Sequence, residues 1–209
     1  MYAIKLEDIH KRYGKNVIFD DFNLSVKKGE MVAIVGDSGV GKSTLLNMIG
    51  LLERPDSGSL TICGEENPQI NSKTTTLLQR NILGYLFQNY ALVDNMTVNQ
   101  NLDIALEYRK VKNRKLAKKQ VLEKVGLSGK LKNKVFELSG GEQQRIAIAR
   151  LMLKPCEIIL ADEPTGSLDD NNRDIVIGLL KEFNEQGKTI LIVTHDKVVS
   201  GVCERVVQL

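Results

Sequence analysis

Long apolar segments are absent from this chain of 209 residues. The longest unbroken apolar run is the stretch of five residues at 31–35, whereas a helix needs about 20 apolar residues to cross a bilayer. The first ten residues also lack the basic and apolar regions of a secretory signal peptide. We therefore expect a cytoplasmic chain that does not itself span a membrane.

Paired cysteines are absent as well. Cys63, Cys156 and Cys203 are far apart and form no CxxC pair. This spacing suggests neither a disulfide framework nor a zinc site, so we expect free thiols or buried small side chains. The composition, 42% hydrophobic and 26% charged, is that of a globular protein. The length suits one substantial core, with or without an inserted lobe, better than two independent domains.

Acidic residues are nearly missing from the segment 109–134. This segment carries eleven Lys or Arg against the single acid Glu123, so its net charge is +10 and that of the remaining chain is −7. A basic lobe could lie near anionic lipid or bind nucleic acid. Because no aromatic residue interleaves with the charges of RKVKNRKLAKK, as a base-stacking surface would require, we favour a solvated helical face.

Hydrophobic periodicity predicts an α/β fold. Alternation in the first 35 residues, and a short apolar run at 60–63 after a turn at 55–58, indicate an antiparallel sheet. Buried-strand runs at 158–161 and 189–194, with a short strand at 205–209, alternate with helical segments. Together with the run at 31–35, they predict a mostly parallel sheet covered on both sides.

The pattern becomes helical in the middle of the chain, for example at 101–108 and 115–125. This change predicts an inserted helical lobe. We expect one domain over residues 1–209, in which 1–88 and 155–209 form the core with its antiparallel subdomain, and 89–154 form the helical subdomain.

A glycine-rich stretch, GDSGVGKST, directly follows the run 31–35 and opens a helical segment. Its glycines allow positive φ and close backbone approach, so several N–H groups and a helix N-terminus can point at one polyphosphate. Lys42 adds a cation for the β- and γ-phosphates, and Ser43 offers a hydroxyl to Mg²⁺. An ordinary glycine turn would not account for the flanking strand and helix. We predict a nucleotide site formed by Gly36, Ser38, Gly39, Gly41, Lys42, Ser43 and Thr44.

Two adjacent carboxylates, Asp162 and Glu163, follow the strand predicted at 158–161. In an open α/β sheet the phosphate loop lies at the same edge. We assign Asp162 to the Mg²⁺ shell and Glu163 to orienting and deprotonating the attacking water. The alternative is that Asp162 only caps the turn 163–166.

The stretch LSGGEQQ, residues 138–144, precedes a helix that we expect to run to Leu153. Ser139 and Glu142 form an S-x-x-E capping box, which is a sufficient structural explanation. Gly140 and Gly141 at the helix N-terminus would also expose donors to an anion. The structural and the functional interpretation can both hold.

With these three motifs in this order, the chain resembles the ATP-binding cassette (ABC) ATPases over essentially its whole length. The resemblance assigns Gln88 to a Mg²⁺ contact, Asp169 to the loop between two ATP sites, His195 to the γ-phosphate and Tyr13 to stacking on adenine. Taken singly, these residues also fit ordinary roles, namely a loop amide, a helix cap, a polar strand end and a hairpin aromatic.

The resemblance implies an ATPase whose nucleotide-binding core, residues 1–88 and 155–209, is of the P-loop NTPase (RecA-like) kind. It also implies that two copies of the chain enclose shared ATP. The phosphate loop of one copy and the Ser139, Gly140 and Gly141 end of the other would form each site. It also implies three catalytic residues, Glu163, His195 and Lys42, and three Mg²⁺ contacts, Ser43, Gln88 and Asp162.

A membrane partner follows from the same resemblance. We expect a homodimer on the inner face of the membrane, docked through residues 88–102 beneath a separate transmembrane permease. The stretches 80–102 and 164–170 most resemble cassettes of macrolide exporters, lipoprotein-release machines and antimicrobial-peptide exporters. Two features depart from the pattern: Gln100 stands where many relatives have glutamate, which leaves a charge pairing at that surface in doubt, and we expect no regulatory domain after Leu209.

Two other hypotheses remain. A nucleic-acid- or ribosome-associated ABC ATPase would use the segment 109–134 as its footprint, but those relatives usually carry a coiled coil or two cassettes. A small-molecule kinase would leave LSGGEQQ unexplained. We therefore expect ATP-driven export or mechanotransmission, without direct nucleic-acid binding.

Overall fold

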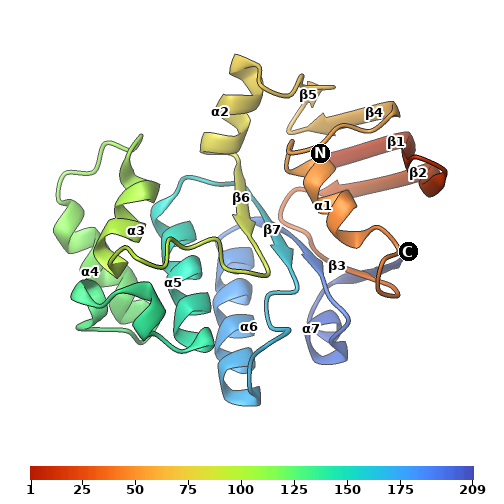
Figure 1. The fold of residues 1–209 in the computed structure, drawn as a ribbon. Helices are drawn as coiled ribbons and strands as arrows, with labels where there is room; N and C mark the ends of the chain where they lie inside the picture. The colour runs from red at the N-terminus through yellow and green to blue at the C-terminus, as the bar shows by residue number, and fades with distance from the viewer.

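Two sheets of different kinds organise the computed structural model, which describes residues 1–209 (Figure 1). The antiparallel sheet has the order β2-β1-β4-β5 and comprises β1 (Tyr2–Tyr13), β2 (Asn16–Lys27), β4 (Ser57–Ile62) and β5 (Glu65–Glu66). The parallel sheet has the order β6-β7-β8-β3-β9 and comprises β3 (Met31–Val35), β6 (Leu83–Leu86), β7 (Ile158–Asp162), β8 (Thr189–Val193) and β9 (Arg205–Gln208). The predicted α/β fold is confirmed.

Strand β8 shows why the parallel sheet forms here. Ile190 and Ile192 enter one hydrophobic core, while Leu191 and Val193 enter the other. A strand that is buried on both faces needs an unbroken apolar sequence rather than alternation. The first core joins this sheet to α3, α4, α5 and α6, and the second joins it to α1 and the antiparallel sheet.

The helices divide between the core and the inserted segment. Core helices are α1 (Lys42–Ile49), α2 (Lys73–Asn81), α6 (Asp170–Glu185) and α7 (Lys197–Gly201). The segment between β6 and β7 holds α3 (Val98–Leu106), α4 (Arg114–Lys124), α5 (Gly140–Leu153) and two short 3₁₀ turns, Lys130–Lys132 and Val135–Glu137.

In Figure 1, α3 and α4 lie at one end of the molecule and the antiparallel sheet lies at the other. The inserted helices share their core with the parallel sheet, and the boundaries proposed at residues 89 and 154 stay a prediction.

The structure differs from the sequence prediction around β4. The predicted turn at 55–58 is wrong in its second half, because Ser57 and Gly58 already belong to β4. Gly58 has φ of 98°, and a Cβ there would lie 2.4 Å from the carbonyl oxygen of Asp8, so this glycine permits a close approach between β4 and β1. Helices α2 and α7 and strand β6 have no counterpart in the prediction, since they are short and carry weak periodicity.

Two sequence expectations can be compared directly with the structure. All three cysteines are free, as predicted. None of the helices has both the length and the apolar character that a bilayer span requires.

Candidate active site

The carboxyl ends of β3, β6, β7 and β8 surround a cleft of about 550 Å³. Among its 12 lining residues Val193 is the single hydrophobic one, so the cleft suits a charged ligand. The structure brings together eleven residues that the sequence singled out: Gly36, Ser38, Gly39, Gly41, Lys42, Ser43, Thr44, Gln88, Asp162, Glu163 and His195.

Position 41 of the phosphate loop requires glycine. Gly41 precedes α1 with φ of 109°, and a Cβ there would lie 2.4 Å from Cγ2 of Ile18. Both the backbone conformation and the available space therefore require glycine. No side chain caps α1, so its N-terminal N–H groups remain available to an anion at the cleft.

Lys42 begins α1 and folds back over the loop. Its Nζ donates to the carbonyl oxygens of Gly36 at 2.8 Å and Asp37 at 2.7 Å. These contacts hold the ammonium group at the mouth of the loop, where a polyphosphate would meet it.

Asp162 ends β7 beside the hydroxyl of Ser43. Burial raises the pKa of the Asp162 carboxyl, the charge of Glu163 raises it further, and a hydrogen bond from Ser43 and the charge of Lys42 oppose these effects. Gln88, which follows β6, lines the same cleft. A carboxylate, a hydroxyl and an amide oxygen form a hard oxygen donor set, and a buried carboxylate with a raised pKa gains from a cation beside it. The residues present therefore fit Mg²⁺.

Glu163 lies next to His195. Its side chain is only 12% exposed, and its Oε1 accepts a hydrogen bond from His195 Nδ1 at 2.8 Å, while Oε2 is buried without a partner. His195 itself is 70% exposed. One carboxylate oxygen is thus oriented by a histidine, and the other keeps its lone pairs unused by any hydrogen bond.

Five predicted residues lie outside the cleft lining. Tyr13 ends β1, where its ring is half exposed and its hydroxyl donates to Glu53 at 2.5 Å. Asp169 caps α6 by accepting from the backbone N–H of Asn172 at 2.8 Å. Ser139, Gly140 and Gly141 form the N-terminus of α5, where the predicted capping box with Glu142 is confirmed. None of these five residues lines the cleft of its own chain.

Two residues of the site were not expected from the sequence. Val193 contributes the one apolar wall of the cleft, and its strand position could have identified it. Gln144 lies in the stretch that the sequence singled out, yet it received no role; its amide reaches the peptide that follows Glu163.

The basic segment 109–134 is partly neutralised within the fold. Lys118 pairs with Asp103 at 2.8 Å, Lys130 pairs with Glu142 at 3.1 Å, and Lys124 pairs with Glu182. Arg109 donates to the carbonyl oxygen of Leu153 at 2.6 Å. These contacts support the interpretation of this segment as a helical face that belongs to the fold.

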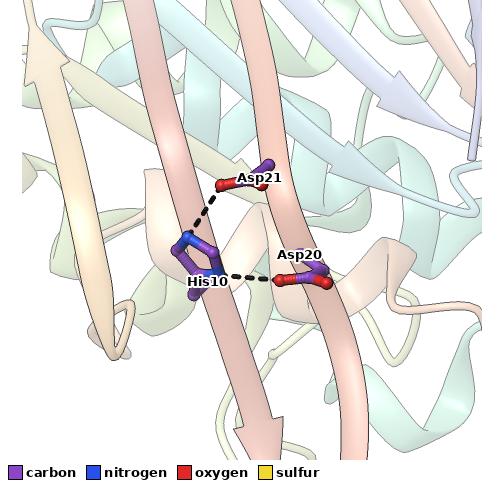
Figure 2. Close-up of side chains that lie close together, drawn as sticks. All are labelled: His10, Asp20 and Asp21. Carbon is purple, nitrogen blue, oxygen red and sulfur yellow. Dashed lines mark hydrogen bonds and ion pairs between the residues drawn. The ribbon is translucent and has the colours of Figure 1, made fainter.

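A histidine and two aspartates meet on the antiparallel sheet, away from the cleft. Figure 2 shows His10 of β1 between Asp20 and Asp21 of β2, with Nδ1 and Nε2 each 2.9 Å from a different carboxylate. The strand register jumps here from Ile9 opposite Phe22 to Lys11 opposite Phe19. Both ring nitrogens are engaged, so neither offers a free lone pair to a metal ion. This cluster secures the irregular pairing of β1 and β2, and we assign no metal to it.

Comparison with known proteins agrees with this geometry. The family model described as ABC transporter matches residues 19–166. The chain is 40% identical over 208 residues to the macrolide export ATP-binding/permease protein MacB of Campylobacter jejuni, which covers 99% of this chain and 32% of that protein. It is 38% identical over 213 residues to the pyoverdine export ATP-binding/permease protein PvdT of Pseudomonas aeruginosa, again 99% of this chain and 32% of that protein. The chain thus spans about a third of the length of the curated relatives it matches.

Solved structures give the same result. The dimeric bacterial ABC transporter cassette MJ0796 superposes with a TM-score of 0.90 at 36% identity, covering 99% of this chain and 94% of that one. A second structure of the same cassette, in a post-hydrolysis state with ADP and Pi, has a TM-score of 0.89 at 35% identity. These matches confirm the resemblance that the motifs predicted, and the chain belongs to the ABC transporter family as an ATP-binding cassette.

Proposed function

We propose that this chain hydrolyses ATP to ADP and phosphate in the cleft at the carboxyl edge of the parallel sheet. The observation that carries the proposal is Glu163, a carboxylate held by His195 with one oxygen unpaired, in a cleft that also holds Lys42 and the phosphate loop. A cassette at 35% identity has been solved with ADP and Pi, which supports the same reaction here.

The residues of the cleft have separate tasks in this proposal. The N–H groups at the start of α1 and the Lys42 ammonium bind the phosphates. Ser43, Gln88 and Asp162 would hold Mg²⁺, which neutralises phosphate charge when it is bound. Glu163 accepts the proton of the attacking water, and His195 keeps the carboxylate oriented and contacts the γ-phosphate. Tyr13 would stack on the adenine ring, since it lies half exposed at the end of β1.

The site is proposed to be completed by a second copy of the chain. Ser139, Gly140 and Gly141 do not line the cleft of their own chain, although α5 presents an N-terminus with donors for an anion. An ATP between two copies would bind the phosphate loop of one and this helix end of the other, and Asp169 would lie in the loop between the two sites. The solved cassette MJ0796 is dimeric, which supports this arrangement.

A membrane-spanning permease is the proposed partner of the dimer. The matched relatives are export proteins that combine ATP-binding and permease functions in one name. We propose that the cassette works at the inner face of the membrane, that residues 88–102 meet the permease, and that ATP-driven closure of the dimer performs export or mechanotransmission. No role for nucleic acid is proposed.

The test is the replacement of Glu163 by Gln. This change keeps the size of the side chain but removes its basicity, so phosphate release should slow by about a hundredfold or more while ATP binding persists. With Mg²⁺ and ATP, the variant should elute as a dimer on size-exclusion chromatography. Glu157→Gln is the matched control, because the Glu157 side chain is 57% exposed and forms a long surface ion pair, 3.8 Å, with Lys28.

Two outcomes would contradict the proposal. Turnover of Glu163→Gln at the rate of the control would remove Glu163 from the reaction. A Glu163→Gln preparation that stays monomeric with saturating ATP, at high protein concentration and with the permease present, would exclude the shared site.

A further inference from the structure

Gln144 of α5 supports the peptide that follows Glu163. Its side chain is buried, with 1% exposure, and Nε2 donates to the carbonyl oxygen of Pro164 at 2.7 Å. Proline has no N–H, so this carbonyl is the only polar backbone group of residue 164, and no other group donates to it. The amide of Gln144 therefore provides the single polar anchor of that residue.

The backbone at Glu163 needs such an anchor. Glu163 has φ of 44°, in the left-handed region that a side chain with a Cβ disfavours. It also precedes a proline, which restricts its backbone further. Its N–H donates to the carbonyl oxygen of Val193 at 2.9 Å, and its carbonyl oxygen accepts from the N–H of Gly166 at 3.2 Å. Strand β8 therefore holds the N–H of the strained residue, and the turn 163–166 holds its carbonyl. Gln144 fixes the next peptide from the opposite element, α5.

All buried side-chain polar atoms that lack a hydrogen-bond partner gather at this one place. They are Oε1 of Gln144, Oε2 of Glu163 and Oγ1 of Thr165. Buried polar groups are normally paired, and strained or unpaired groups tend to collect at functional sites. The segment 163–165 and Gln144 thus form one unit, in which the surrounding fold maintains a strained backbone and unpaired buried polar atoms.

Gln144 also lies on the helix whose N-terminus is proposed to meet the second copy. It is three residues after Gly141, or about 4.5 Å along the helix axis. The capping box fixes the first turn of α5, and Ile146, Ala147 and Ile148 anchor the following turn in the core. A displacement of the helix end that meets the second copy therefore moves Gln144, and with it the peptide after Glu163.

We propose that Gln144 is a positioning residue for Glu163, through which α5 sets the orientation of the general base in its own chain. This inference rests on the proposed function, because it concerns the carboxylate assigned there as the base. Gln144 does not line the cleft; it acts only through the backbone that follows Glu163.

The experiment compares two Gln→Met variants of the full chain. Gln144→Met keeps an unbranched side chain of similar length but has no donor for Pro164. Gln79→Met is the control, since Gln79 lies on a helix and donates to the carbonyl oxygens of Gly50 and Leu51, both at 3.1 Å, and does not line the cleft. ATPase kinetics, ATP affinity by calorimetry and thermal melting are measured for each.

For Gln144→Met, kcat should fall by about tenfold or more, because a base displaced by a fraction of an ångström loses much of its effect. KM and the ATP affinity should stay within about twofold of wild type, because the phosphate loop is untouched. In a Glu163→Gln background, Gln144→Met should cause no further loss of turnover, since no base remains to be positioned. If Gln144→Met does not fold, Gln144→Asn serves instead, because its amide remains polar but is one methylene too short.

Three results would overturn the inference. One is a folded Gln144 variant with kcat within twofold of wild type. Another is a fall in kcat that Gln79→Met reproduces along with the same loss of melting temperature, which would mark the effect as structural. The third is a full additional loss in the Glu163→Gln background. A wild-type chain without ATPase activity would instead refute the proposed function itself, and the role of Gln144 with it.

Discussion

Replacing Asp162 by Asn should stabilise the nucleotide-free protein while it strongly slows hydrolysis. Asp162 lies half-buried at the end of β7, beside a second carboxylate, Glu163. Burial and that neighbouring charge raise the pKa of Asp162, against the opposing effects of Ser43 and Lys42. A raised pKa means that the ionised carboxylate is less stable in the folded than in the unfolded chain, so its charge destabilises the fold at neutral pH.

The magnitude follows from this geometry. Asparagine has the same shape, and its carbonyl oxygen can still accept the hydrogen bond from Ser43, so the substitution removes the charge and little else. Relief of a single unfavourable charge of this kind contributes about 1 kcal/mol. For a chain of 209 residues that corresponds to a rise in melting temperature of roughly 2–4 °C. The lost charge should lower Mg²⁺-dependent hydrolysis by about a hundredfold or more.

Thermal melting and phosphate release, each measured with and without Mg²⁺ and ATP, test this prediction. Asp174→Asn is the matched control, because Asp174 is 67% exposed on α6 and makes only a 3.4 Å contact with Arg173. A melting temperature of Asp162→Asn at or below that of wild type would refute the electrostatic argument. Hydrolysis equal to that of the control would refute the assignment of Asp162 to the metal.

Two further predictions concern other parts of the chain. Lys42→Ala should weaken ATP binding by about tenfold to a hundredfold, because charge-assisted hydrogen bonds to phosphate are lost, and unchanged affinity in calorimetry would contradict the role of Lys42. Glu30→Gln should cost about 1–2 kcal/mol of folding free energy at neutral pH, since Glu30 accepts from Arg205 at 2.7 Å. Although burial opposes it, the hydrogen bonds from Arg205 and from the Lys27 N–H lower the pKa of Glu30 below its ordinary value of 4.5. Its contribution is therefore complete above pH 4.5 and lost as pH falls through the lowered pKa, so a difference between variant and wild type that does not shrink in acid would count against it.

The cleft could be predicted from the sequence because its residues are encoded in short, contiguous motifs. The phosphate loop, Asp162 with Glu163, and His195 each follow a buried strand, and parallel strands bring their carboxyl ends to one edge. Motifs that lie far apart in the sequence thereby come together at one edge of the sheet. The same reasoning could not find α2 or β6, whose sequences carry no strong periodicity.

Contacts between polar side chains and distant loops could not be predicted. Gln143 and Gln144 are identical neighbours in the sequence, but they point about 100° apart around α5. Gln143 donates to the carbonyl oxygens of Val135 and Leu138, whereas Gln144 turns inward to Pro164. Only the packing of α5 against β6 and α6 decides which of the two reaches the segment of the general base.

The contacts of α5 also explain how several loops can respond to a single movement. Gln144 holds Pro164, Arg145 donates to Asn172 in the first turn of α6, and Arg150 donates to the carbonyl oxygens of Tyr90 and Ala91. Tyr90 and Ala91 both have positive φ, at 62° and 47°, so their conformation depends on such support. The peptide after the proposed base, the helix capped by Asp169 and the segment proposed to meet the permease are therefore attached to one helix within about two turns. Because α5 moves as a rigid body, the three attached segments cannot shift independently. A displacement of α5 that begins at any one of them therefore displaces the other two.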